Sequence, residues 1–152
     1  HVEARRLFGL AAAQGNAAAQ CMLGIFNAHG QGGPRDHVEA RRLFELAATQ
    51  EYAEAQHSLG VLYENGDGGR QDYVEARRLH GLAAAQGLAQ AQCNLGLMYD
   101  GGCGVSKDEE TAVRFYGQAA AQGRSPPAHS SHSSSLVVAL VAVGGSQYGG
   151  SF

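Results

Sequence analysis

The stretch that decides the fold is HVEARRLFGLAAAQG, residues 1–15, because the chain repeats it with few changes. It returns as HVEARRLFELAATQE at residues 37–51 and as YVEARRLHGLAAAQG at residues 73–87, a constant spacing of 36 residues. A fixed period of this length indicates a repeat architecture in which each copy is one supersecondary unit. We therefore divide the chain into three complete copies, 1–36, 37–72 and 73–108, and a half copy, 109–123.

Two helical patterns alternate in each complete copy. The first segment of the second copy places apolar residues on one helix face: Ala40, Leu43, Phe44, Ala47 and Ala48. An aspartate stands before this segment and its two successors, as expected of a helix N-cap: Asp36, Asp72 and Asp108. The second segment also has helical spacing, with Ala55, Leu59 and Gly60 in the second copy. Each copy is therefore expected to be a helical hairpin.

Glycines recur at the ends of the first helical segments and at one position inside the second segments. Gly15, Gly87 and Gly123 follow the first segments, where a left-handed residue is expected to end the helix. The second copy has Glu51 there, which costs about 1 kcal/mol if the geometry is kept. Gly60 lies inside a helical segment, where glycine costs about 1 kcal/mol relative to alanine. We expect a close helix crossing to compensate for this recurrent glycine.

The fold class that follows is all-α. One hairpin cannot bury its apolar face alone, so stacked copies must form a continuous core. We predict an α/α superhelical solenoid of antiparallel helix pairs, about seven helices, over residues 1–123. Residues 124–152 form a low-complexity tail in which Pro126 and Pro127 interrupt any helix. We expect poor order from about Arg124 to Ser135, and a strand or a short capping helix at LVVALVAV, residues 136–143.

The repeated residues resemble the Sel-one-like repeat, a branch of the tetratricopeptide-like helical repeats. The pattern that carries this resemblance is clearest in the third copy, which has Ala76, Leu79, Ala83, Ala84, Gly87, Ala91, Gln92, Leu95, Gly96, Tyr99, Gly102, Gly104 and Asp108. The period of 36 residues also differs from the period of about 34 in the ordinary tetratricopeptide repeat. The resemblance covers roughly residues 1–123.

The resemblance implies work as a scaffold or adaptor that binds a partner protein or peptide through the concave groove of the solenoid. One cysteine-rich branch of the family has a disulfide in each repeat and is linked to penicillin binding. In this chain the expected partners of Cys93 and Cys21 are Ala120 and Ala48, which disfavours that branch. A third interpretation is a passive spacer within a longer protein, because the chain starts inside a repeated phrase and without Met.

Composition and motifs exclude several other classes. A net charge of −3 gives no basic excess for nucleic acid, and the longest apolar run is too short to span a membrane as a helix. Three cysteines are too few for a disulfide framework and favour a reducing compartment, although localisation and oligomeric state stay unknown. We find no nucleophile elbow, phosphate-loop lysine or zinc-protease motif. We therefore expect neither an enzyme nor a cofactor.

The candidate partner-binding residues are charged side chains that recur on the first segments. Stacking of the copies would align them into a ladder that could bind an acidic peptide. The ladder consists of Arg5, Arg6, Arg41, Arg42, Arg77, Arg78 and Arg114. The alternative is a solvated face, because Glu39 and Glu75 are spaced to neutralise one arginine of their pairs. His80, which replaces phenylalanine on the apolar face, is either a half-buried residue or a pH-sensitive contact.

Two histidine-containing patterns are weighed as metal sites. Cys21, His57 and Cys93 occupy one register, but neighbouring copies place equivalent atoms about 9–10 Å apart. Zinc ligands lie about 2.0–2.3 Å from the metal. His129 and His132 lie in a serine-rich stretch that is better explained as low-complexity filler. We expect no metal site.

Overall fold

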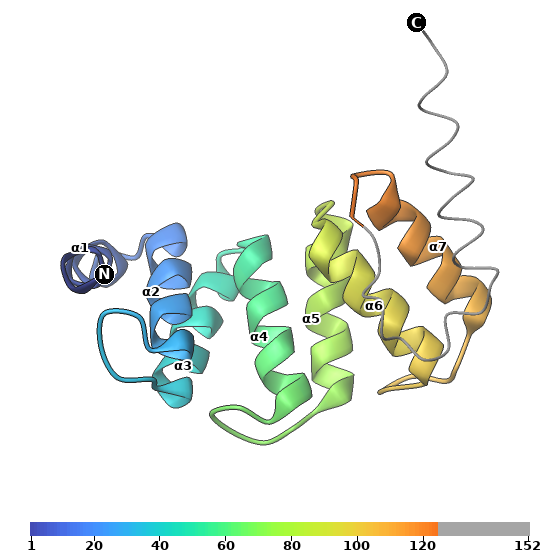
Figure 1. The fold of residues 1–152 in the computed structure, drawn as a ribbon, viewed down its shortest axis with the longest axis horizontal. Helices are drawn as coiled ribbons and strands as arrows, with labels where there is room; N and C mark the ends of the chain where they lie inside the picture. The colour runs from blue at the N-terminus through green and yellow to red at the C-terminus, as the bar shows by residue number, and fades with distance from the viewer. Residues whose placement is uncertain (125–152) are drawn as a thin grey trace, which may run out of the picture.

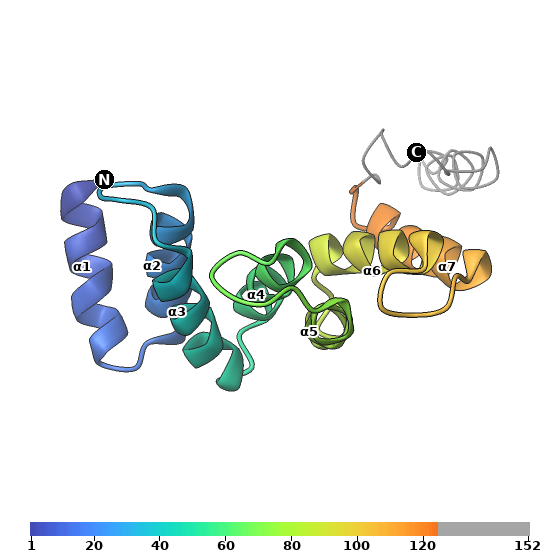
Figure 2. The same cartoon turned by 90° about the horizontal axis from the view of Figure 1, so that it is seen from below.

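The computed structural model describes residues 1–124, which form seven helices and no strand. The helices are α1 (Val2–Ala13), α2 (Ala17–His29), α3 (His37–Thr49), α4 (Ala53–Asn65), α5 (Tyr73–Ala85), α6 (Ala89–Gly101) and α7 (Glu109–Ala120). They follow one another in a row (Figure 1), with α2, α4 and α6 along one side and α3 and α5 along the other (Figure 2). The predicted all-α solenoid is confirmed. The expectations for the tail and for His129 and His132 lie outside the described residues.

The ends of the helices follow from the residues that the repeat places there. Asp36, Asp72 and Asp108 each accept a hydrogen bond from a backbone N–H three residues later, at 3.0–3.1 Å. These caps satisfy donors that a helix N-terminus leaves unpaired. Glu51 keeps the left-handed backbone of the glycines at the same register, with φ of 61°. The second copy therefore carries the strain that its sequence predicted.

The core lies at the junctions between hairpins, where a glycine of one helix meets an aromatic ring of the next. Gly24 lies against Phe44, Gly60 against His80 and Gly96 against Tyr116. A Cβ atom added to any of these glycines would lie 2.6–2.7 Å from the nearest ring atom. The mid-helix glycines thus permit the close crossing that the sequence predicted, and only a residue without a side chain fits.

A comparison of α1 with α3 and α5 shows which apolar side chains the junctions bury. Leu7 on α1 is 52% exposed, whereas Leu43 and Leu79 at the same register are 2% exposed. Within the described residues, no helix covers this face of α1, while α2 and α4 cover the corresponding faces of α3 and α5. Burial of the repeated apolar phrase therefore depends on the neighbouring copy, as in other stacked repeats.

A row of glutamine pairs also connects consecutive copies. The amide of Gln50 donates to the side-chain oxygen of Gln20 at 3.0 Å, and the pairs Gln86–Gln56 and Gln122–Gln92 repeat this contact at 2.9 Å. Each bond joins the end of a first helix to the second helix of the preceding copy. The recurrence of glutamine in the phrases AAAQG and AQ was a visible signal that our interpretation of the sequence did not use.

Candidate partner-binding surface

The predicted arginine ladder divides into two rows with different surroundings. The first arginine of each pair turns toward its own hairpin. Arg41 donates hydrogen bonds to the backbone oxygens of Leu62, Asp67 and Arg70 at 2.9–3.4 Å. Its guanidinium carbon also lies 4.2 Å from the centre of the Tyr63 ring. Arg41 therefore satisfies carbonyl groups at the end of α4, a role that suits a cation at a helix C-terminus.

Arg5 makes the equivalent contacts in the first hairpin. It donates to the backbone oxygens of Gln31 and Pro34 and to the side-chain oxygen of Asn27. Asn27 stands at the register of Tyr63, so the first hairpin uses a hydrogen bond where the second uses ring stacking. The departure of Asn27 from the repeat pattern is explained by this contact.

Arg77 in the third hairpin does not reproduce this clamp. Its Nε atom is buried without a hydrogen-bond partner among the described residues. The cause lies in the loop, where Val105 replaces the glycines that the other copies have at positions 33 and 69. A Cβ atom at Gly69 would lie 2.8 Å from Nη1 of Arg41, and one at Gly33 would collide with Arg5. Val105 therefore carries a side chain at the register where an added Cβ atom would meet the guanidinium group in the other two hairpins.

We expect the change Gly69→Val to lower the free energy of unfolding by about 2 kcal/mol, because it displaces Arg41 from several backbone oxygens. Urea denaturation followed by circular dichroism measures this loss. In an Arg41→Met background the same change should cost less than about 0.5 kcal/mol, since no guanidinium group remains to be displaced. Equal costs in the two backgrounds would contradict the clamp.

The second arginine of each pair points to solvent and is paired with a glutamate one helical turn earlier. The nitrogen–oxygen distances are 2.5–2.6 Å for Arg6–Glu3, Arg42–Glu39 and Arg78–Glu75. The hydrogen bond from Arg42 holds the pKa of Glu39 below its usual value. The three arginine side chains remain 56–59% exposed. This row is accessible, and each of its charges has a counter-charge beside it.

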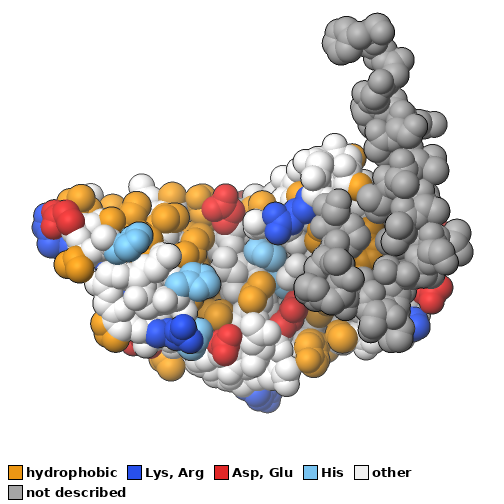
Figure 3. Space-filling view, in the orientation of Figure 1, with side chains coloured by type: hydrophobic (Ala, Val, Ile, Leu, Met, Phe, Trp, Pro, Cys, Tyr) orange, Lys and Arg blue, Asp and Glu red, His pale blue; other side chains and the backbone are white. Residues whose placement is uncertain are grey.

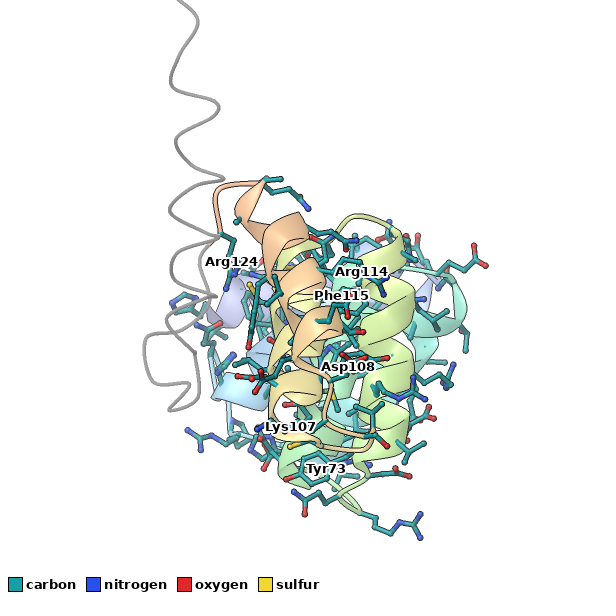
Figure 4. All side chains as sticks on the ribbon, turned by 90° about the vertical axis from the view of Figure 1, so that its right-hand side faces the viewer. Tyr73, Lys107, Asp108, Arg114, Phe115 and Arg124 are labelled. Carbon is teal, nitrogen blue, oxygen red and sulfur yellow. The ribbon has the colours of Figure 1, made fainter. Side chains whose placement is uncertain are left out.

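Arg114 continues the row on α7 in different surroundings. Thr111 stands where the other copies have a glutamate, so that register supplies no carboxylate. The guanidinium carbon of Arg114 lies 5.7 Å from the centre of the Phe115 ring. Figure 4 shows Arg114 and Phe115 on one side of α7 and Arg124 on the other. Arg114 is therefore the cation of the row that forms no ion pair with a glutamate among the described residues.

Exposed apolar side chains flank the solvent-facing arginines. A valine lies four residues before each arginine and is 60–73% exposed, and a leucine lies four residues after it and is 41–55% exposed. We call the resulting surface of α1, α3 and α5 the first-helix face: Val2, Arg6, Leu10, Val38, Arg42, Leu46, Val74, Arg78 and Leu82. The sequence prediction selected the arginines and missed the valines and leucines, although their spacing of four residues places all three on one helix side.

His80 is fully buried and belongs to a polar network in the middle junction. Its Nε2 atom lies 2.7 Å from Oε1 of Glu64, and its Nδ1 atom lies 3.2 Å from Nδ1 of His57. In the tautomer of His80 that carries its hydrogen on Nε2, this N–H donates to Glu64, and Nδ1 accepts from Nδ1–H of His57. In this conformation His80 has no exposed surface to offer a partner.

The three junctions use related residues at the same registers. The first has Phe44 with Ala28, the second has His80 with Glu64, and the third has Tyr116 with Asp100. Asp100 is 5% exposed, and burial followed by its charge raises the pKa of Tyr116. An acidic residue therefore occurs where the ring is polar, and alanine occurs where the ring is phenylalanine.

The middle junction should make stability depend on pH. Burial and the neighbouring His80, followed by Arg124, lower the pKa of His57 to about 4. An imidazole in an unfolded chain titrates near about 6.5, so the unfolded state binds an extra proton between about pH 6.5 and pH 4. The free energy of unfolding therefore decreases as pH falls through this window.

We expect the wild type to lose about 2 kcal/mol more stability between pH 7 and pH 5 than the variant His57→Cys, at about 1.4 kcal/mol per pH unit. Cysteine is the residue of the first and third copies at this register. Urea denaturation at both pH values measures the difference. Parallel losses in the two proteins would show that His57 does not titrate in this way.

The other candidate chemical groups are inert in this structure. The thiols of Cys21, Cys93 and Cys103 are free. Burial raises the pKa of the Cys21 thiol to about 12, and it also raises the pKa of the Cys93 thiol above its ordinary value. A thiol with a raised pKa is a poor nucleophile.

In residues 1–124, no three His, Cys, Asp or Glu side chains are grouped to hold a metal ion. No helix in that range has the length and apolarity to cross a membrane.

Comparison with known proteins agrees with the repeat geometry. The Sel1 repeat family matches residues 1–16, 17–52, 53–88 and 89–123. The chain therefore belongs to the Sel1 repeat family, whose helical repeats commonly act as scaffolds for protein interactions. From residue 17 onward, the matched segments begin at the second helix of each hairpin, whereas our copies begin at the first.

The solved structures that are similar to this chain include two Sel1-type repeat proteins. One is a Sel1 repeat protein from Oxalobacter formigenes, with 35% identity and a TM-score of 0.67 over 72% of this chain and 43% of that protein. The other is c5321, a protective antigen present in uropathogenic Escherichia coli strains displaying an SLR fold. It shares 37% identity, with a TM-score of 0.75 over 77% of this chain and 25% of that protein. The chain thus spans less than half of either relative. No curated protein gives a significant match.

Proposed function

We propose that this chain binds a partner protein or peptide through the first-helix face, as a scaffold or adaptor. The observation that carries the proposal is the threefold recurrence of an exposed valine, arginine and leucine on α1, α3 and α5. Large apolar side chains that recur on one surface are typical of interaction sites, whereas isolated ones are ordinary. The family supports the same class of function, since Sel1 repeats commonly serve protein interactions.

The chemistry of this face favours a partner with alternating apolar and acidic side chains. Valine and leucine offer apolar area, and each exposed arginine can form a bidentate bond with a carboxylate. A partner carboxylate must compete with Glu39 for Arg42 and with Glu75 for Arg78. Arg114 has no such competitor at the equivalent register of its own helix.

Other residues that the sequence prediction selected act on the first-helix face indirectly, through contacts inside the solenoid. Arg5 and Arg41 use their guanidinium groups on the backbone of their own hairpins, so they shape the surface instead of contacting a partner. His80 lies inside the middle junction and acts in the same indirect way. The direct contacts that we propose are those of Arg6, Arg42 and Arg78 with the neighbouring valines and leucines, together with that of Arg114 on α7.

Partner capture with crosslinking tests the proposal. The wild-type chain should retain at least one protein that the double variant Arg42→Glu/Arg78→Glu loses. A matched control is Arg70→Glu/Lys107→Glu, which reverses two exposed loop cations and should retain the same protein. Circular dichroism must show equal helicity in all three baits.

The other outcomes decide between the alternatives. Capture of the same partner by both double variants would show that the arginine row is a solvated face. Capture of nothing by any bait would favour a passive spacer. Saturable binding of a β-lactam by the wild type would favour the ligand-binding or enzymatic interpretation instead.

A further inference from the structure

A cavity of about 490 Å³ lies between α2 and α4 and is also lined by His37 and Phe44 of α3. Its floor is apolar and is formed by Ile25, Phe44 and Val61. Its rim is polar and includes His29 and Arg35. Figure 3 shows histidine side chains gathered on this face. Volumes of about 300–1,000 Å³ are usual for sites that bind small ligands. We call this cavity the first groove.

The first groove is specific to one junction, because the next junction closes the same place. The corresponding cavity between α4 and α6 has a volume of only about 100 Å³ and is lined by Glu64 and Tyr73. These residues stand 36 positions after Ala28 and His37, which line the first groove. Two larger side chains therefore fill the second site, while alanine and histidine leave the first one open.

The polar rim contains a cation and an imidazole nitrogen that lack partners in the described chain. Within residues 1–124, Arg35 forms no ion pair, and Nδ1 of His37 is buried without a hydrogen-bond partner. His29 lies beside them in the last turn of α2. A carboxylate placed here would meet a guanidinium group and imidazole nitrogens. A buried polar atom without a partner is costly, and a ligand could satisfy it.

The groove also limits which ligand fits. Asp67 lies on the same rim, so a ligand with several acidic groups would be repelled by its carboxylate. His57, in the wall, is held by its contact with His80, which in turn is bonded to Glu64. The apolar floor suits one hydrophobic side chain. The matching ligand therefore combines one apolar and one acidic side chain in adjacent positions.

We propose that the first groove binds a peptide segment in which an apolar side chain is followed or preceded by a single acidic side chain. The apolar side chain lies on Ile25, Phe44 and Val61, and the acidic side chain meets Arg35 and His37. The inference rests on the proposed function only in taking a protein segment as the ligand. The residues involved differ from those of the first-helix face.

The test is an NMR titration of the full ¹⁵N-labelled chain with the peptide acetyl-Gly-Glu-Phe-Gly-amide. We expect saturable shifts at the residues that line the first groove. The peptides acetyl-Gly-Lys-Phe-Gly-amide and acetyl-Gly-Glu-Gly-Gly-amide should bind at least fivefold more weakly, since each lacks one half of the recognised pair. Equal binding of all three peptides, or no saturable shift with the first, would overturn the proposal.

Variants taken from the chain's own second junction provide the controls. Ala28→Glu/His37→Tyr should weaken binding at least tenfold by filling the groove. Arg35→Gln, which copies Gln71 on an exposed loop, should weaken the acidic peptide about fivefold without affecting the fold. Arg42→Glu/Arg78→Glu should leave the peptide affinity unchanged. If this last variant alone abolishes binding, the peptide binds the first-helix face, and the proposed function survives while the groove proposal fails.

Discussion

Replacement of Glu64 by alanine should lower the free energy of unfolding by about 3 kcal/mol at pH 7. The reason is that His80 is 0% exposed and bonds Glu64 through Nε2. Without the carboxylate, a buried imidazole N–H loses its acceptor. Urea denaturation monitored by circular dichroism at 222 nm measures the loss.

A triple variant separates the loss of this bond from a general intolerance of the site. His57→Cys/Glu64→Ala/His80→Phe installs the residues of the first junction, Cys21, Ala28 and Phe44, at the second. We expect its stability to return to within about 1 kcal/mol of the wild type, because a well-packed apolar set often replaces a buried polar one without loss. A triple variant less stable than Glu64→Ala alone would contradict the equivalence of the junctions.

The second large effect concerns the glycines under the rings. Gly24→Ala should lower the free energy of unfolding by about 2–3 kcal/mol, since the new methyl group would lie 2.6 Å from a ring carbon of Phe44. Phe44 is 2% exposed, and the atoms that the methyl group would meet belong to its rigid ring, so the contact can be relieved only by moving the whole ring. Thermal and urea denaturation of the variant measure the cost.

Gly81→Ala is the matched control within the same fold. Gly81 is also inside a helix, but an added Cβ atom would meet no atom within 4 Å. The change should raise the free energy of unfolding by about 1 kcal/mol, the helix-propensity difference between the two residues. If both alanine variants raise the free energy of unfolding, helix propensity and not packing determines the effect of these glycines.

The fold could be predicted because the same pattern of helix starts, helix ends and apolar positions recurs every 36 residues. The 36-residue period defines the hairpins, the aspartates define the helix starts, and Glu51 identifies a left-handed backbone position by contrast with the glycines. Each of these signals is local in the sequence. The glutamine pairs were missed because they join residues 30 positions apart in different copies, and a hydrogen bond of this kind has no local signature.

The candidate site could be predicted only in part. Recurrence identified the arginines, but it could not distinguish Arg41, which bonds the loop backbone, from Arg42, which faces solvent. That distinction depends on Gly69, a loop residue 28 positions after Arg41. The burial of His80 was equally hidden, because its partner Glu64 belongs to the preceding helix. Properties that depend on contacts between copies appear only in the folded structure.

The most direct test of the proposed function is hydroxyl-radical footprinting of the chain, alone and in complex with the partner captured by the wild-type bait. We expect oxidation of Leu46 and Leu82, which are 41% and 43% exposed in the free chain, to fall at least threefold in the complex. Oxidation of Met22 on α2 should stay unchanged. Unchanged oxidation of both leucines in a saturated complex would show that the partner binds elsewhere and would contradict the first-helix face as the binding surface.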